Sequence, residues 1–328
     1  MNLWKNTVQQ SEIGQKKYTG RFGQFFIYLF KLFRLFILQS DWKVLPMSAI
    51  IAAMVSMAVG AGLFQTMEGT FQGTFALTCV CIWNGFFNSI QAICRERAII
   101  KREHRAGLHI TSYVAAHVVY QFILCLAQSA ITVIVCYYTG VKDSPKAGSP
   151  VNVLLDFRTE LFITLVLITF AADMMALMIS AIVHTQMAAM TVMPFMLIIQ
   201  LVFSGFIALP ESVSDVSKLM LSKWGVQGLC VISHYNELDA VMIWNKMASG
   251  GDKIDIGGGV TVKDVMGIVD EQGMRDSVLQ KLSQANYRED FSAIGDILGE
   301  SWFTLILFAI IFAIITVVFL EFIDRDKR

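Results

Sequence analysis

RERAIIKREHR, at positions 95–105, is a densely charged segment that lies between two apolar ones. About twenty uncharged residues precede it and a longer uncharged run follows it. A helix of roughly 20 apolar residues crosses the hydrocarbon core of a membrane, whereas charged side chains are expensive to place there. The alternation therefore predicts two membrane spans joined by a charged loop outside the bilayer.

The same pattern extends over the rest of the chain. Of the 328 residues, 55% are hydrophobic and only 16% are charged, whereas soluble domains carry roughly 25% charged residues. Asp173 is the one Asp, Glu, Lys or Arg within six apolar runs of spanning length. We therefore expect an all-α polytopic membrane protein with six transmembrane helices. The expected spans are 44–63, 74–94, 112–138, 161–183, 187–209 and 301–320.

Basic residues set the expected orientation. Lys and Arg outnumber Asp and Glu before the first span and again in the loop 95–111. The positive-inside rule places both segments in the cytoplasm, and six spans return the C-terminus to that side. The first forty residues lack the pattern of a cleavable signal peptide. The expected location is the cell (plasma) membrane, with multiple spans and with the N- and C-termini cytoplasmic.

Five segments are expected along the chain. Residues 1–20 form a polar tail, and residues 21–40 form an amphipathic helix. Lys31 and Arg34 lie near the middle of that helix, which favours the membrane interface over a further span. Residues 41–209 hold spans one to five, 210–300 a small extracellular subdomain, and 301–328 the sixth span and C-terminus. Within the subdomain, 222–245 is expected to pack as a helix against the membrane face.

Signatures of soluble enzymes are missing from the sequence. It has no G-x-x-x-x-G-K-[ST] phosphate loop, no H-E-x-x-H pair and no C-x-x-C pair, and its five histidines are scattered. We therefore expect no catalytic residue, no metal site and no cofactor on this chain. The formal net charge of zero gives no reason to expect a nucleic-acid partner.

Polar side chains recur within the spans at helical spacing. Asn84, Asn88 and Gln91 share one face of the second span, and His117 and Gln121 begin a weaker stripe on the third. Such stripes either line a solvated cavity or join helices by hydrogen bonds. The spacing does not distinguish these two roles.

Asp173 and the loop 95–111 each allow two interpretations. An acid within a span suggests a proton relay, but Asp173 has no basic residue at membrane depth, which favours a structural role. The loop either fixes topology or docks on a partner protein. Orientation needs only Lys and Arg, so the alternating Glu96 and Glu103 favour docking.

The run E-R-x-I-I-x-R-E at 96–103, followed by Gly107 and Ser112-Tyr113, resembles the loop between spans two and three of ABCG-like (White/pleiotropic drug resistance) ABC transporter membrane domains. The helix at 21–40 is similar to that family's connecting helix. FSGFIALP at 203–210 resembles the end of its fifth span. The long outer loop before a lone last span occupies the same place. The resemblance covers about residues 20–325.

This resemblance implies roles for particular residues. The loop would pack with the connecting helix and touch a nucleotide-binding domain, and Gln91 lies where many members have an acid of an internal polar relay. The cavity would lie between the second and fifth spans of two copies, below an apolar gate. The implied substrate path is Asn84, Asn88, Ile198, Leu201, Phe206 and Ile207. The implied contacts to the ATPase are Glu96, Arg97, Arg102, Glu103 and Arg105.

The expected function is therefore that of a bacterial stand-alone permease subunit of an ATP-driven exporter. It would work as a homo- or heterodimer in the lipid membrane, powered by a separate ABC ATPase that binds ATP and Mg. The expected cargo is amphipathic: a lipid-like molecule, a peptide or a drug. Two alternatives are a proton-coupled secondary transporter that uses Asp173, and a non-transporting membrane scaffold or immunity protein.

Overall fold

Helices account for nearly all regular structure in the described part of the chain. The computed structural model describes residues 20–38, 41–60, 62–139, 141, 153–205, 215–251, 255–257, 259–283, 287–292 and 295–322. The elements at the membrane are α2 (Arg21–Leu38), η1 (Asp41–Lys43), α3 (Val44–Val59), α4 (Met67–Ser89), α5 (Ala92–Arg105), α6 (Ile110–Tyr138), α7 (Phe157–Ile182), α8 (Gln186–Val202), α10 (Leu221–Ile232) and α14 (Gly295–Glu321). The remaining elements are η2 (Tyr235–Glu237), α11 (Leu238–Gly250), β1 (Asp255–Gly257), β2 (Val260–Thr261), α12 (Val262–Glu271), α13 (Arg275–Ser283) and η5 (Glu289–Phe291).

Four helical segments among the described residues are long and apolar enough to cross a membrane. They are 67–105, Ile110–Tyr138, Phe157–Ile182 and Gly295–Glu321. The expected first and fifth spans coincide with the shorter apolar helices α3, of 16 residues, and α8, of 17 residues. At about 1.5 Å per residue, α3 reaches roughly 24 Å, less than the roughly 30 Å of a hydrocarbon core. The polytopic helical architecture is thus established, and the count of six spans stays a prediction.

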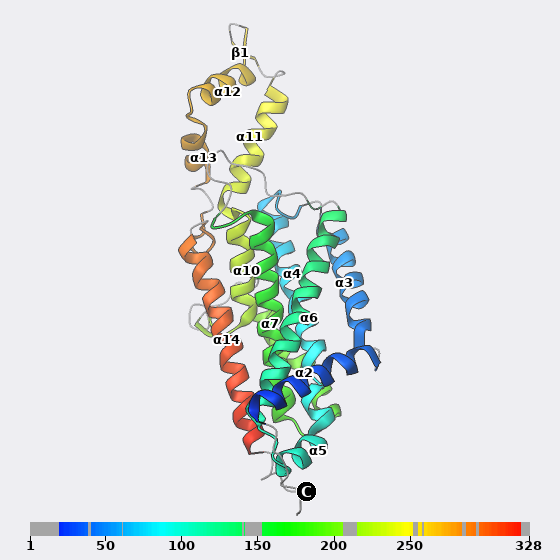
Figure 1. Ribbon diagram of the computed structural model, residues 1–328. Coiled ribbons are helices and arrows are strands. Elements are labelled where there is room, and N and C mark those ends of the chain that lie inside the picture. The colour runs from blue at the N-terminus through cyan, green and yellow to red at the C-terminus, as the bar shows by residue number, and fades with distance from the viewer. Residues whose placement is uncertain are drawn as a thin grey trace, which may run out of the picture.

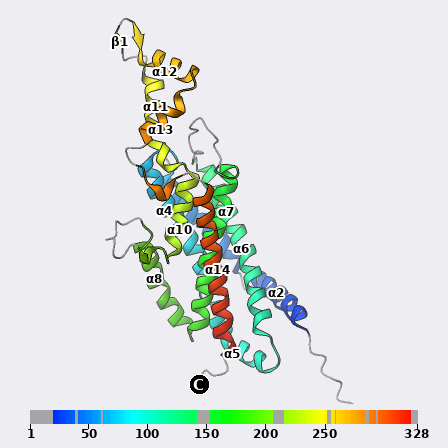
Figure 2. The ribbon, with the colours of Figure 1, turned by 90° about the vertical axis from the view of Figure 1, so that its left-hand side faces the viewer.

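α7 is the central helix of the bundle. Most of its residues are buried, and it packs against α4, α6, α10 and α14. The helices run side by side along the long axis of the molecule, and α2 crosses them near the end that carries α5 (Figure 1). α8 makes few contacts with the other helices and stands apart from them in Figure 2.

α10 packs inside the bundle, although its sequence lies in the range assigned to the outer subdomain. It packs against α4, α7 and α14, and nearly all of its side chains are buried. The Gly225 Cα comes so close to α4 that a Cβ there would lie 2.8 Å from Thr78 Cγ2. Gln200 of α8 accepts a hydrogen bond from the Ser222 backbone N–H at 3.1 Å, which satisfies a donor at the helix start. The expected single helix over 222–245 is instead two helices, α10 and α11.

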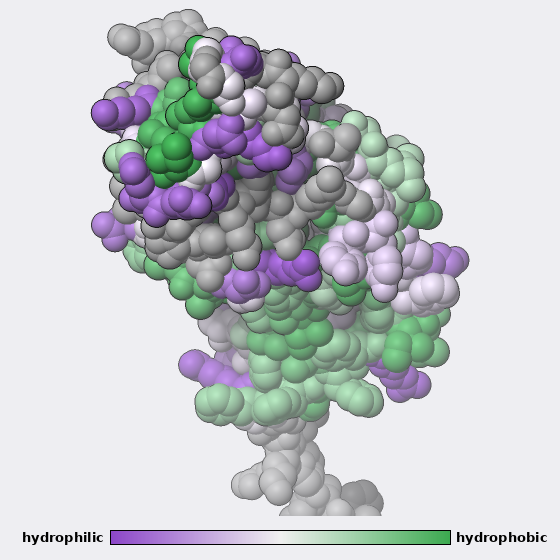
Figure 3. Space-filling model, turned by 90° about the horizontal axis from the view of Figure 1, so that it is seen from above, coloured by the Kyte–Doolittle hydropathy of each residue, from purple (hydrophilic) through white to green (hydrophobic). Residues whose placement is uncertain are grey.

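The elements from α11 to α13 project beyond the bundle at the end opposite α5 (Figure 1). A small hydrophobic cluster holds them together, with Trp244, Met266 and Leu279 at its centre. β1 and β2 pair antiparallel at the tip. Seen from above, hydrophilic residues surround a hydrophobic patch on this projection, and hydrophobic residues cover the helices beneath it (Figure 3).

Candidate functional site

α5 is an amphipathic helix at one end of the bundle. It follows α4 after a bend at Ile90 and Gln91 and carries the charged stretch quoted above. Ile93, Cys94 and Ile100 are its buried residues. Its charged side chains therefore lie toward the neighbouring helices and toward solvent, as the period of an α-helix requires.

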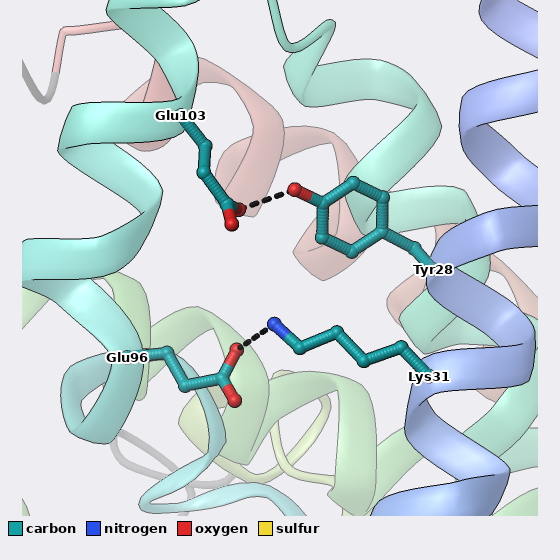
Figure 4. A network of polar contacts seen from close by, with 4 residues as sticks. All are labelled: Tyr28, Lys31, Glu96 and Glu103. Carbon is teal, nitrogen blue, oxygen red and sulfur yellow. Dashed lines mark hydrogen bonds and ion pairs between the residues drawn. The ribbon is translucent and has the colours of Figure 1, made fainter.

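Two polar contacts join α5 to α2. The Tyr28 hydroxyl donates a hydrogen bond to Glu103 Oε2, and Lys31 Nζ lies 3.3 Å from Glu96 Oε2. Tyr28 and Lys31 are three residues apart on α2, and Glu96 and Glu103 are seven residues apart on α5. Each helix therefore presents both of its residues on one face. Figure 4 shows both contacts bridging the two helices. Burial and the Glu103 carboxylate raise the pKa of Tyr28, so its hydroxyl stays protonated and can donate.

Gln24 adds a third link between α2 and the turn after α5. Its amide donates to the Gly107 carbonyl at 3.0 Å and accepts from the His109 backbone N–H at 2.9 Å. Gly107 has a φ of 104°, a left-handed conformation that glycine adopts without strain. The sequence did not predict the role of Gln24, because an amide on an amphipathic helix has no distinctive spacing.

A second set of contacts joins α5 to the C-terminal end of α7. Arg97 Nη1 donates to the carbonyl of Ala181 at 2.7 Å and to that of Val183 at 3.4 Å. The Ser180 hydroxyl accepts from the backbone N–H groups of Ile93 and Cys94, both at 3.1 Å. A basic side chain at a helix C-terminus is favoured by its unpaired carbonyls and by the helix dipole. α5 is thus fastened to both α2 and the central helix.

The five residues expected to contact an ATPase divide into two groups. Glu96, Arg97 and Glu103 hold α5 within its own chain through the contacts just described. Arg102 and Arg105 are exposed on the surface of α5. These two arginines are the exposed members of the set, and their contact with an ATPase stays a prediction.

A polar network lies deeper in the bundle between α4, α6 and α7. Asn88 and Gln128 exchange two amide hydrogen bonds, at 2.8 Å and 3.0 Å. Asn88 Nδ2 also donates to Asp173 Oδ2 at 3.5 Å, and the Cys125 thiol donates to the same oxygen at 3.4 Å. Asp173 is completely buried. The stripes on the second and third spans therefore meet, and here they join helices by hydrogen bonds.

The expected substrate path is only partly assembled within one chain. Asn84 is buried, with 4% of its surface exposed, whereas Ile198 on α8 is 54% exposed. A cavity of about 240 Å³ is lined by Asn88 and Gln91, but neither Ile198 nor Leu201 contributes to it. Phe206 and Ile207, the expected gate, lie outside the described residues. Asn88 of α4 bonds to Gln128 of α6 and Asp173 of α7, and the path between two copies stays a prediction.

Comparison with known proteins agrees with this arrangement. Residues 23–233 match the model of the family described as ABC-2 type transporter. The chain is also 29% identical over 206 residues to the ABC transporter ATP-binding/permease protein Rv1747 of Mycobacterium tuberculosis. That alignment covers 60% of this chain and 23% of the relative, so the chain spans about a quarter of the relative's length.

Proposed function

This chain belongs to the ABC-2 type transporter family, and we propose that it is the permease subunit of an ABCG-like exporter. In this proposal a separate ABC ATPase binds ATP and Mg and drives alternating access in the membrane subunit. The cargo is an amphipathic molecule such as a lipid, a peptide or a drug. The relative from Mycobacterium tuberculosis is described as both ATP-binding and permease, which supports pairing this membrane domain with an ATPase.

The double attachment of α5 is the observation that carries the proposal. Arg97 ties α5 to the C-terminal end of α7, and Glu103 ties it to Tyr28 of α2. A displacement of α5 would therefore pull on the central helix and on the interfacial helix together. Such a lever is what a permease needs if movements of an ATPase outside the membrane are to reach its spans.

The orientation of α5 supports the same proposal. The positive-inside rule places α5, with the exposed Arg102 and Arg105, on the cytoplasmic side. An ATPase that uses cytoplasmic ATP would meet this surface. The apolar face of α8, which includes the exposed Ile198, would then face lipid or a second permease copy in a homo- or heterodimer.

The first experiment is affinity purification of this protein from native membranes in mild detergent. We expect an ATPase with a phosphate loop to co-purify in stoichiometric amount, together with any second permease. Loss of the ATPase in a preparation that keeps other membrane complexes intact would count against the proposal.

Coupling is tested in vesicles that contain the complete transporter. Glu103→Lys places a cation beside Tyr28, removes the hydrogen-bond acceptor and should abolish cargo-stimulated ATP hydrolysis while the protein stays in the membrane. Lys263→Glu, a charge reversal on the distant α12, is the matched control and should leave coupling unchanged. Normal coupling in the Glu103 variant would contradict the proposal that α5 transmits movements of the ATPase to α2 and α7.

A proton-coupled transporter is the second candidate, and one observation favours it. Asp173 is buried at the centre of the bundle, and among the described residues its Oδ1 atom has no hydrogen-bond partner. Asp173→Asn keeps the shape of the side chain but removes its titration. The ABC proposal predicts transport within a few-fold of wild type in this variant, whereas a proton-coupled carrier would stop.

A further inference from the structure

A groove of about 340 Å³ lies between the C-terminal end of α6 and the N-terminal end of α7. α6 begins at the turn after α5, so the groove is at the end of the bundle opposite α5 (Figure 1). Both helices are long and apolar enough to cross a membrane, and they pack against each other. The groove is distinct from the cavity beside Asn88 and Gln91, because the two share no lining residue among those described.

The buried residues that line this groove form an apolar floor. Phe64, Phe157 and Leu161 belong to it and are 1%, 8% and 5% exposed. The rings of Phe64 and Phe157 pack edge to face, with their centroids 5.2 Å apart. Phe64 has a φ of 60°, a left-handed conformation that is strained for a bulky side chain. Strain of this kind persists only where the surrounding structure requires it, and ligand sites are among the places where it is found.

The rim of the groove consists of exposed side chains from the last turns of α6. Ile134, Tyr137 and Tyr138 line the groove, and they are 54%, 60% and 82% exposed. Ile134 follows the exposed Ile123 by eleven residues, close to three helical turns, so the two share one face of α6. An exposed apolar face on a helix of spanning length meets the hydrocarbon of the bilayer. In the membrane, the groove therefore opens toward lipid.

Arg158 is the charged side chain among the described residues that line the groove. Its guanidinium carbon lies 5.1 Å from the centroid of the Tyr137 ring, within the range of a cation–π interaction. Tyrosines at the end of a span are typical of the headgroup level of a bilayer. Arg158 therefore places positive charge at the depth of lipid phosphates. A guanidinium is suited to that group, because its planar fork donates two parallel hydrogen bonds to phosphate oxygens.

The chemistry of the floor and of Arg158 defines the occupant. Water would find no hydrogen-bond partners along the rings of Phe64 and Phe157. An acyl chain gives these side chains the dispersion contacts that an empty groove would lack. The bilayer supplies such chains at this surface, and each is attached to a phosphate headgroup. A headgroup with net negative charge is complementary to Arg158, whereas a zwitterionic headgroup carries its own cation beside the phosphate.

We propose that this groove binds a phospholipid of net negative charge, with one acyl chain over Phe64, Phe157 and Leu161 and the phosphate against Arg158. The positive-inside rule places α5 in the cytoplasm, so the opposite end of the bundle lies in the outer leaflet. The lipid is a bound component of the protein at that leaflet. The proposal goes beyond the transport function, because it requires neither a particular cargo nor an ATPase.

The test maps the contacts of two photoreactive lipids that differ in headgroup charge. Phosphatidylglycerol and phosphatidylcholine with the same diazirine-tagged acyl chains are each added in trace amounts to phosphatidylcholine vesicles that contain the full-length protein. After illumination, peptide mass spectrometry counts the adducts in 133–141 and 157–161. These are divided by the adducts in 306–314 of α14, where Ile306, Ile310 and Ile314 are exposed. We expect this ratio to be at least fivefold higher for phosphatidylglycerol, equivalent to about 1 kcal/mol.

One variant removes the proposed headgroup contact, and two serve as controls. Arg158→Gln should reduce the preference for phosphatidylglycerol to less than twofold. Arg34→Gln removes another exposed cation, but Arg34 belongs to α2 and does not line the groove, so the preference should stay. Asp156→Asn neutralises an exposed acid at the same end of α7 and should leave the preference unchanged or raise it. Thermal unfolding checks that each variant is folded.

Four outcomes would overturn the proposal. Equal ratios for the two lipids in the wild type would mean that the groove takes any lipid or is filled by protein. A preference that survives in the folded Arg158 variant would place the selection of the headgroup elsewhere. Loss of the preference in the Arg34 variant would show an effect of total charge. Loss in the Asp156 variant would show that the end of α7 is sensitive to any substitution.

Discussion

Tyr28 and Lys31 hold the same helix to α5 by contacts of different strength. The Lys31 side chain is 34% exposed, and exposed ion pairs stabilise proteins by about 0–1 kcal/mol. Tyr28 is partly buried and donates to a carboxylate, a class of hydrogen bond that contributes about 1.5–3 kcal/mol. The Tyr28–Glu103 bond therefore dominates the polar attachment of α2.

Tyr28→Phe should loosen α2 from α5 more than Lys31→Met does. We expect the free energy of unfolding to fall by about 1.5–3 kcal/mol in the first variant and by less than about 1 kcal/mol in the second. A double-mutant cycle with Glu103→Gln, followed by thermal unfolding in detergent, measures the pairwise energy. A larger loss of unfolding free energy in the Lys31 variant than in the Tyr28 variant would contradict this prediction.

The Tyr28 contact should also resist alkaline pH. Burial and the nearby carboxylate raise the pKa of Tyr28 in the folded protein above its unfolded value of about 10. The stabilisation is therefore complete below about pH 10 and is lost as the pH rises through the folded pKa. The difference in unfolding free energy between wild type and Tyr28→Phe should stay constant from about pH 7 to 9. A difference that also stays constant as the pH rises above about 10 would show that the phenol has its ordinary pKa in the folded protein.

The residues of the site could be predicted only in part. The alternating charges of 95–105 predicted that Glu96 and Glu103 take part in docking, because alternating signs suit salt-bridged contacts with a neighbouring helix or protein. The pairing of these two acids with Tyr28 and Lys31 could not be predicted, since the partners lie 65 or more positions away and pairing over that distance depends on tertiary packing. The polar stripes were found from their period. Only the structure shows that Asn88 turns toward Gln128 and Asp173.

At the scale of elements, the packing of α4 on α7 depends on a glycine. A Cβ at Gly85 would lie 2.5 Å from the Thr169 carbonyl oxygen and 2.7 Å from the Asp173 backbone nitrogen. Neither backbone atom can move without shifting α7. The two helices therefore approach each other through a small residue, which is a common form of packing between membrane helices.

Gly85→Ala should destabilise the protein by about 1–3 kcal/mol, because it overpacks the contact between α4 and α7. Gly299 of α14 is the matched control, since no atom lies within 4 Å of a Cβ built there. Gly299→Ala should be neutral or stabilising by up to about 1 kcal/mol, as alanine is the better helix former. Thermal unfolding of the two variants in detergent should therefore show opposite shifts. A stable Gly85 variant would contradict the close approach.

Hydropathy located most of the elements but not all of their boundaries. Long apolar runs predicted α4, α6, α7 and α14, because the bilayer imposes a minimum length on a span. Hydropathy did not predict the burial of α10, because its 12 residues are too few to span a membrane and its burial comes from packing against α4, α7 and α14. The apolar run 222–245 predicts one helix, whereas Ser233, His234 and η2 separate α10 from α11. His234 adopts a left-handed conformation, with a φ of 53°.

At the scale of the whole molecule, the bundle has different structures at its two ends. α5 and the turn after it form one end, and α11 to α13 project from the other (Figure 1). α8 lies at the side, with Phe195 63% exposed and Ile198 54% exposed. An apolar helix with so few intrachain contacts must be covered by lipid or by another chain.

Cysteine cross-linking in native membranes tests whether α8 meets a second copy. If the chain forms a homodimer through α8, Ile198→Cys should give an oxidant-dependent band at twice the mass. Met54→Cys on α3 is the control, because that side chain is 60% exposed but lies on a different helix. Wild type, which retains its six native cysteines, sets the background. Equal bands in the two variants would indicate random collision.

The burial of α10 constrains how this protein is made. Ribosomal synthesis delivers α10 before α14, yet α14 forms one wall of the groove that encloses it. The insertion machinery cannot leave α10 in the bilayer as an independent span, since its ends carry unsatisfied backbone groups. Gln200 can satisfy only part of that requirement. We therefore expect α10 to be enclosed only after α14 has been made, and truncation before α14 should send the nascent protein to degradation.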